Sequence, residues 1–233
     1  MKLSILIPVY NEKSTISVIL DKIASLDLGF AEKEIIIIDD GSTDGTREFL
    51  RSLNSEYKIL YHDKNQGKGA AIRTGLKEAT GAYVVVQDAD LEYDPQDLRT
   101  MVQKMIADNL RVLYGSRRLN KENKQHSGFQ YYVGGWFLTL VTNMLYAQRL
   151  TDEPTCYKMF KTDFLRSMPL ACLRFEFCPE VTALSALAGE KIKEIPISYF
   201  PRHRNEGKKI KWQDAITAIR VLVFYKIKSL FKK

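Results

Sequence analysis

Two aspartates separated by a single residue follow an apolar, β-branched run near the middle of the chain. Asp88 and Asp90 come just after residues 83–86, and Glu92 follows two positions later. In extended backbone the side chains at i and i+2 point to the same side, so both aspartates can face one ion. Carboxylate oxygens suit Mg2+ or Mn2+, which often complete their coordination with substrate phosphates. The pattern predicts a divalent metal site; the alternative is an acidic turn before a helix beginning at Pro95.

The segments around this run alternate between strand-like and helix-like patterns. Short apolar runs predict strands at residues 3–9, 34–38, 59–61, 83–86 and 110–114. Between them we expect helices, the first capped by Asn11 and ending near residue 25, the others ending near residues 53, 79 and 107. This alternation predicts βαβ units and an α/β fold with a parallel sheet. Because ligands bind beyond the carboxyl ends of such strands, Asp88 and Asp90 lie where a site is expected.

The second half of the chain is less regular. Residues 131–146 and 176–188 predict helices, and residues 151–158 are rich in turn formers and predict a connecting link. Residues 192–200 predict a late strand pair or hairpin edge, interrupted by Pro196.

A glycine-rich turn precedes the helix that ends near residue 79. Gly67 and Gly69 match the start of a dinucleotide-binding fingerprint, but Ile72 stands where a third glycine or alanine is expected. Free backbone amides at such a helix start can bind phosphate. The incomplete pattern favours a plain helix-start turn over a phosphate site.

The net charge of +7 is concentrated at the end of the chain. Residues 202–233 contain ten Lys or Arg against Glu206 and Asp214, which makes this segment +8 and the remainder about −1. A nucleic-acid partner usually requires a basic face with interleaved aromatic residues on the main fold, and the sequence shows no such pattern. The local charge instead favours anionic lipid headgroups.

The last segment has an amphipathic pattern. Apolar residues recur at intervals of three and four, at Trp212, Ile216, Ile219, Val223, Ile227 and Leu230. Basic residues on the other face predict a helix lying in the plane of a membrane interface. The alternative is a terminal helix that docks on the core and leaves a solvated back.

Cysteine content and hydropathy bear on the compartment. Cys156, Cys172 and Cys178 form no CxxC pair, which favours free thiols in a reducing environment. The apolar runs are too short for a signal peptide or a membrane span. We expect a cytoplasmic protein that associates peripherally with the cytoplasmic face of a membrane.

Four segments at predicted strand ends are more specific together than any one alone. They are residues 7–12, 36–45, 81–91 and 114–117. In this order they resemble glycosyltransferase family 2, the inverting nucleotide-sugar transferases with the GT-A fold, a Rossmann-like, mostly parallel sheet flanked by helices. The likeness covers about residues 1–210, so we expect a GT-A domain over 1–210 and a basic amphipathic helix over 211–233.

Two later features are similar to the polyprenyl-phosphate subgroup of that family, the dolichyl-phosphate mannosyltransferase-like enzymes. Residues 151–155 resemble its Asp-x-Thr segment, and Arg202 with residues 206–210 matches a second segment. The resemblance implies transfer from a nucleotide sugar, GDP-mannose or a UDP-hexose, to a polyprenyl phosphate at the membrane surface, with Mg2+ or Mn2+ as cofactor.

Matching positions imply roles for individual residues. The nucleotide would be lined by Pro8, Tyr10, Glu12, Ile38, Asp40, Asp88 and Ala89. Phosphates would be held by Arg117, Arg202 and Lys208, and the metal by Asp88, Asp90 and Glu92. The residues implied to be catalytic are Asp90, Arg117 and Glu180.

The chain departs from the subgroup at three positions. Glu92 replaces a usual Gln, and Gly135 and Thr139 stand where an arginine and a serine are expected to bind the acceptor phosphate. Arg117, Arg118 or Lys124 would then have to compensate.

Glu180 leaves an alternative function open. It is either a general base, as acidic residues in this part of related enzymes can be, or a carboxylate stabilised at the start of its helix. As a base it would suit a family 2 transferase acting on a saccharide or a small soluble acceptor.

Overall fold

The computed structural model describes all of the chain except residues 30, 54–56, 124–127, 203–211 and 232–233. Its strands are β1 (Lys2–Val9), β2 (Glu32–Asp39), β3 (Lys58–Tyr61), β4 (Tyr83–Val86), β5 (Val112–Ser116), β6 (Lys158–Lys161) and β7 (Lys193–Pro196). Its helices are α1 (Ile16–Ala24), α2 (Thr46–Ser52), α3 (Lys68–Glu78), α4 (Asp97–Ala107), α5 (Phe129–Tyr146), α6 (Thr162–Arg166), α7 (Phe177–Leu187) and α8 (Trp212–Leu230).

The strands form one mostly parallel sheet, in the order β3-β2-β1-β4-β6-β5-β7. Strands β1 to β4 pair in parallel, and β7 pairs in parallel with β5. Only β6, among the described strands, runs antiparallel to its neighbours β4 and β5. The predicted α/β class with a mainly parallel sheet is confirmed.

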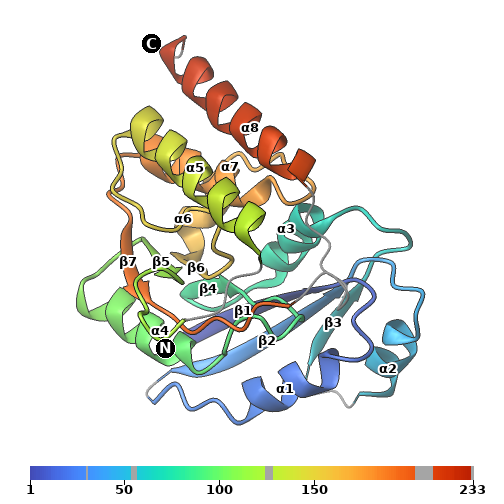
Figure 1. Ribbon diagram of the computed structural model, residues 1–233. Coiled ribbons are helices and arrows are strands. Elements are labelled where there is room, and N and C mark those ends of the chain that lie inside the picture. Colours follow the sequence, from blue (N-terminus) through green and yellow to red (C-terminus); the bar gives the residue numbers. More distant parts are fainter. Residues whose placement is uncertain (30, 54–56, 124–127, 203–211, 232–233) are drawn as a thin grey trace.

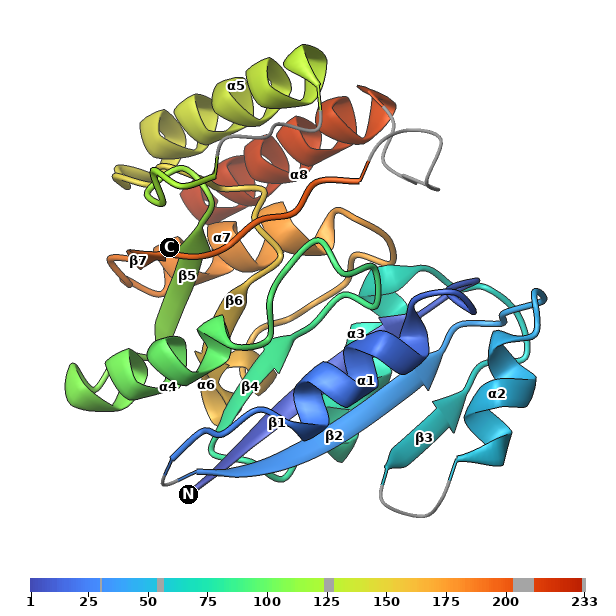
Figure 2. The same cartoon turned by 60° about the horizontal axis from the view of Figure 1, so that its bottom comes forward.

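Helices cover both faces of the sheet, which is why the strands read as continuous apolar runs. Alternate residues of β1 point to opposite faces, so Ile5 packs with α1 and α4 while Leu6 packs with α3, α6 and α7. Figures 1 and 2 show this layering, with α1 and α3 on opposite sides of the sheet.

A third apolar cluster lies beyond the sheet. It joins α5, α7 and α8 through buried side chains, namely Leu138, Tyr146, Ala183, Ala218, Leu222 and Tyr225. The Tyr146 hydroxyl donates to the Leu222 carbonyl over 2.6 Å. The three helices form one end of the molecule, opposite α1 and α2 (Figures 1 and 2). The predicted domain boundary at residue 210 lies outside the described residues and stays a prediction.

The predicted link over residues 151–158 is confirmed up to Tyr157, and β6 and α6, which follow it, were not predicted. Two other local expectations, the hairpin and the helix cap, were wrong. Residues 192–200 form no hairpin, because β7 pairs in parallel with β5. Asn11 does not cap α1: its φ is 52°, its side-chain oxygen accepts from the Thr43 amide, and the helix begins at Ile16.

Candidate active site

Arg202 joins the carboxyl ends of two adjacent strands. Its guanidinium lies 3.3 Å from a Glu12 carboxylate oxygen, just beyond β1, and 3.2 Å from an oxygen of Asp90, beyond β4. Although burial opposes it, the neighbouring carboxylates raise the pKa of Arg202. The structure therefore brings together three residues predicted to share one site.

Asp90 lies in a crowded, negatively charged environment. Burial and the nearby Asp88 and Glu92 carboxylates raise its pKa to about 7, against the opposing effect of Arg202. An excess of negative charge at a strand end suits a divalent cation, which would favour the ionised form of the carboxylate. The donor set therefore fits Mg2+ or Mn2+ completed by substrate phosphate oxygens.

Asp88 is held by a lysine from the glycine-rich turn. The Lys68 ammonium lies 2.5 Å from an Asp88 oxygen and 3.1 Å from the Cys156 sulfur. Burial opposes ionisation of Asp88, yet the Lys68 charge holds its pKa below the usual value. Lys68, the first residue of α3, thus places a fixed positive charge beside the predicted diphosphate site.

Glu92 holds the segment that carries Arg202. Its carboxylate accepts from the Tyr199 hydroxyl at 2.9 Å and from the Arg202 amide at 3.1 Å. Within the described part of the chain, no group of three His, Cys, Asp or Glu side chains is arranged to hold a metal ion. Asp88 pairs with Lys68, and Glu92 bonds to the 199–202 segment. The metal set of Asp88, Asp90 and Glu92 therefore stays a prediction.

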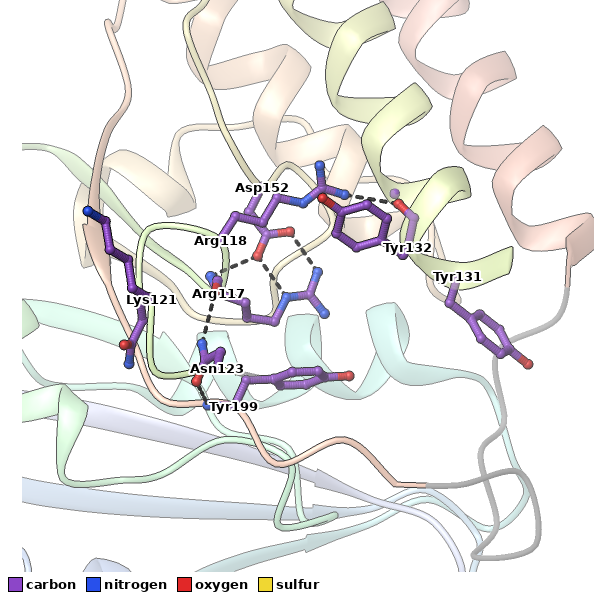
Figure 3. Close-up of a pocket in the computed structure, with 10 residues that line it drawn as sticks. Arg117, Arg118, Lys121, Asn123, Tyr131, Tyr132, Asp152 and Tyr199 are labelled. Carbon is purple, nitrogen blue, oxygen red and sulfur yellow. Dashed lines mark hydrogen bonds and ion pairs between the residues drawn. The ribbon is translucent and has the colours of Figure 1, made fainter. Parts of the chain in front are cut away.

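Arg117 is fixed by a bidentate ion pair at the end of β5. Its Nε and Nη2 atoms each donate to Asp152 at 2.7 Å, and its amide donates to the same carboxylate at 2.9 Å. The guanidinium also lies over the Tyr199 ring, 5.0 Å from its centroid. Figure 3 shows Asp152 facing Arg117, with Tyr199 on the other side of the guanidinium. Such a fork-to-fork pair preorganises the guanidinium.

A cavity of about 270 Å3 lies beside Arg117. Its lining combines basic, amide and aromatic side chains, and consists of Arg117, Arg118, Asn120, Lys121, Asn123, Tyr131, Tyr132, Gly135, Asp152 and Tyr199. The Arg118 guanidinium lies over the Tyr132 ring and donates to the Tyr132 carbonyl (Figure 3). A Cβ on Gly135 would lie 3.4 Å from that guanidinium, so Arg118 fills the space above the missing side chain.

Thr139, the other departure from the subgroup pattern, has structural partners. Its hydroxyl donates to the Gly135 carbonyl and accepts from the Glu153 amide at 3.0 Å. These bonds fix the 151–155 turn against α5.

The remaining predicted nucleotide residues differ in their surroundings. Asp40 is buried and accepts from the amides of Gln66 and Gly67, so it shapes the turn that presents Lys68. Ile38 is fully buried in the core beside α3. Pro8 and Val9 are the last two residues of β1, and Tyr10 follows them. Ala89 is buried between Asp88 and Asp90. The turn leads directly into α3, as the helix-start interpretation predicted.

Glu180 has a buried environment at the start of α7. Its carboxylate accepts from the amides of Ala171 and Cys172 and from the Tyr225 hydroxyl of α8 at 2.7 Å. These bonds tie α8 to α7 and occupy both carboxylate oxygens. Lys208, predicted to hold phosphate, and Lys124 lie outside the described residues.

Two site residues received no role from the sequence. Lys68 stood in a turn that failed the dinucleotide fingerprint, although its place between two glycines after a strand was a usable signal. Asp152 was recognised only as part of a motif. Its role as the partner of Arg117 depends on β6 bringing residues 151–155 to the end of β5.

Comparison with known proteins places these features in a family. The model of the family "Glycosyl transferase family 2" matches residues 4–168. The chain belongs to glycosyltransferase family 2, which confirms the resemblance read from its strand-end segments. The GT-A fold is likewise confirmed by glucosyl-3-phosphoglycerate synthase from Mycobacterium tuberculosis, solved with Mn2+, UDP and phosphoglyceric acid. That structure has a TM-score of 0.69 and 18% identity, over 99% of this chain and 78% of that one.

The names of two curated relatives refer to polyprenyl phosphates. Dodecaprenyl-phosphate galacturonate synthase of Rhizobium johnstonii is 24% identical over 89% of this chain and 62% of its own length. UDP-N-acetylglucosamine–dolichyl-phosphate N-acetylglucosaminyltransferase of Methanococcus voltae is 29% identical over 83% of each chain. The chain thus spans less than two thirds of the first relative.

Proposed function

We propose that this protein transfers a sugar from a nucleotide sugar to a polyprenyl phosphate. The observation that carries this proposal is the cavity lined by Arg117, Arg118 and Lys121, whose lining residue Tyr199 donates to Glu92 beyond the end of β4. Its cations suit an anionic acceptor next to the donor's diphosphate. The names of the two curated relatives support a polyprenyl phosphate as that acceptor.

The donor diphosphate would lie between Asp90 and Lys68. Asp90, with Asp88 beside it, would hold Mg2+ or Mn2+, the ion pair of Lys68 setting the orientation of Asp88. The M. tuberculosis enzyme, solved with UDP and either ion, supports this cofactor. When bound, the ion would neutralise charge on the departing nucleoside diphosphate. Glu12 and Arg202 would fix the nucleotide end of the crevice.

The chemical step needs no general base in this arrangement. A polyprenyl phosphate is anionic at neutral pH, so one of its oxygens can attack the anomeric carbon directly. The new oxygen–carbon bond forms on the face opposite the breaking bond, and the nucleoside diphosphate leaves with the bonding electron pair, inverting the anomeric centre. Arg117, fixed by Asp152, would hold the acceptor phosphate in place, and Lys68 would stabilise the negative charge that develops on the departing diphosphate.

A transfer assay tests this proposal. The full chain is incubated with Mn2+, labelled GDP-mannose, UDP-glucose, UDP-N-acetylglucosamine or UDP-galacturonate, and a short, water-dispersed polyprenyl phosphate. We expect an acid-labile, lipid-extractable product from one donor. Transfer of label only to a soluble saccharide or small molecule would contradict the lipid acceptor.

The alternative with a soluble acceptor requires Glu180 as base, and Glu180→Gln separates the two. In the variant, the NH2 group of the new side chain would face the backbone amides of Ala171 and Cys172 and the Tyr225 hydroxyl, which are themselves hydrogen-bond donors. We therefore expect a loss of about 1–3 kcal/mol in the free energy of unfolding. Because hydrogen bonds within the fold occupy both oxygens of the Glu180 carboxylate, turnover per folded molecule should stay within about threefold of wild type. If a folded variant lost turnover by several hundredfold, Glu180 would instead be supported as the general base.

The expected location is the cytoplasmic face of a membrane. No helix of the described chain is long and apolar enough to cross a bilayer. A lipid acceptor would bring the protein to the membrane surface, and the +8 segment over 202–233 would favour anionic headgroups.

A further inference from the structure

The Lys68 side chain carries a positive charge into the acidic end of β4. Its ammonium lies 2.5 Å from an Asp88 carboxylate oxygen and 3.1 Å from the Cys156 sulfur. The side chains of Lys68 and Asp88 are only 14% and 15% exposed. Charges so little hydrated are stable in a fold when they are paired. Lys68 therefore neutralises one of the two aspartates that are proposed to hold a metal ion.

The second aspartate also has a cation from within the chain. One guanidinium nitrogen of Arg202 lies 3.2 Å from Asp90 and another lies 3.3 Å from Glu12. The backbone amide of Arg202 donates to Glu92 at 3.1 Å, which fixes this residue from a third side. The strand ends thus combine four carboxylates with two cations, and the cation from α3 is the one held through a single carboxylate.

The backbone that carries Lys68 is fixed in place. The Ala70 amide donates to the Leu173 carbonyl at 2.9 Å. A Cβ on Gly67 would lie 2.5 Å from that carbonyl oxygen, and a Cβ on Gly69 would lie 2.6 Å from the carbonyl oxygen of Cys172. Only glycine allows the two segments to approach this closely. The start of α3 therefore holds the ammonium close to the end of β4.

This placement sets Lys68 against a metal ion. A divalent ion at Asp88 and Asp90 would have to share Asp88 with the ammonium, and like charges at such short range repel strongly in a partly buried site. A diphosphate between the two cations changes the sign of the interaction, because its oxygens attract the ion and the ammonium alike.

We propose that Lys68 makes the binding of the metal ion and the binding of the donor's diphosphate depend on each other. In the protein without donor, the ammonium competes with the ion for Asp88. With the donor bound, the diphosphate lies between the two cations and is held by both. The inference rests on the proposed function for the donor and for the ion's place at Asp88 and Asp90. It follows that the ion alone binds weakly, and that ion and nucleotide strengthen each other's binding by the same factor.

The first test is the Mn2+ affinity of the full chain without nucleotide. Lys68→Gln removes the charge but keeps a hydrogen-bond donor for Asp88, and it should tighten Mn2+ binding about tenfold. The measurement is a Mn2+ titration in which free Mn2+ is read by electron paramagnetic resonance. Damage to the fold would weaken Mn2+ binding, so a gain in affinity identifies Lys68 as a competitor of the ion.

The second test is nucleotide affinity at saturating Mn2+, measured by titration calorimetry with UDP and with GDP. The same variant should bind the preferred nucleotide about tenfold more weakly, because the diphosphate has lost one of its two cations. The matched control is Lys77→Gln, which removes an exposed lysine in the last turn of α3 and should change neither affinity. If Lys68→Gln weakens both ligands, or leaves the Mn2+ affinity unchanged, the proposal is wrong.

The wild-type protein offers a measurement that needs no variant. Saturating Mn2+ should raise its affinity for UDP or GDP about tenfold over protein treated with a chelator, and an unchanged affinity would overturn the proposal. These measurements contain no acceptor, so they separate this inference from the proposed function. Absence of transfer to a polyprenyl phosphate would refute that function while the binding results still decide the role of Lys68. Active transfer by a wild type whose nucleotide affinity ignores Mn2+ would refute only the interdependence.

Discussion

Asp90→Asn should reduce sugar transfer by about a hundred- to a thousandfold while leaving the fold intact. The substitution removes one of three crowded carboxylates, so it relieves repulsion in the protein without metal. It also removes the carboxylate proposed to hold a divalent ion, which would stabilise the departing diphosphate. The measurement is initial transfer rate, together with the Mn2+-dependent rise in melting temperature that UDP or GDP produces.

The matched control is Asp63→Asn. Asp63 is an exposed carboxylate that follows β3, so it lies beyond the carboxyl end of a parallel strand, as Asp90 does. It should retain wild-type transfer and the same Mn2+-dependent shift. Full turnover by Asp90→Asn would show that the metal site assigned here is wrong, even if the family assignment stands.

Arg117→Met should destabilise the fold by about 3–5 kcal/mol, because it leaves the Asp152 carboxylate without its counterion. Asp152 is fully buried, and both of its oxygens accept from the Arg117 side chain. Adding Asp152→Asn to Arg117→Met should restore much of this loss, since the buried charge is then absent. Urea unfolding of the two single variants and the double variant measures the coupling. A single variant within about 1 kcal/mol of wild type would contradict a buried, interdependent pair.

The same pair predicts a direction for the pH dependence. Burial disfavours the ionised Asp152 side chain, but Arg117 holds its pKa below the usual value. A lowered pKa in the folded state gives stability that is present above the unfolded pKa of about 3.9 and is lost as pH falls through the folded value. The stability of wild type relative to Asp152→Asn should therefore be constant near neutral pH and shrink below about pH 4.

Much of the first half of the fold could be predicted from the sequence. Strands β1 to β4 are apolar because both faces of the sheet are covered, and their ends carry the polar residues that form the crevice. The ion pairs of Arg202 with Glu12 and Asp90 connect residues up to 190 positions apart, and only the family resemblance had brought them together.

The contacts that decide each residue's task could not be predicted. Nothing in the local sequence shows that Glu92 accepts a hydrogen bond from Tyr199, or that Glu180 accepts one from Tyr225 of α8. Both depend on distant segments packing against carboxylates whose spacing alone suggested chemistry. The exposed face of α5 could not be predicted for a related reason. Its apolar pattern is also typical of a buried helix, and only the structure shows which side α7 and α8 leave uncovered.

The antiparallel strand β6 sets the scale of the crevice. By lying between β4 and β5, it separates the ends that carry Asp90 and Arg117 by two interstrand spacings, about 10 Å. Because it runs the opposite way, its entering turn, with Asp152 and Cys156, forms the floor of that gap. If β4 and β5 were direct neighbours, Asp90 and the Arg117 guanidinium would lie about one interstrand spacing apart, roughly 5 Å, which would leave less width for the proposed donor diphosphate and acceptor phosphate side by side. The inserted strand would thus act as a spacer between the two proposed phosphate sites.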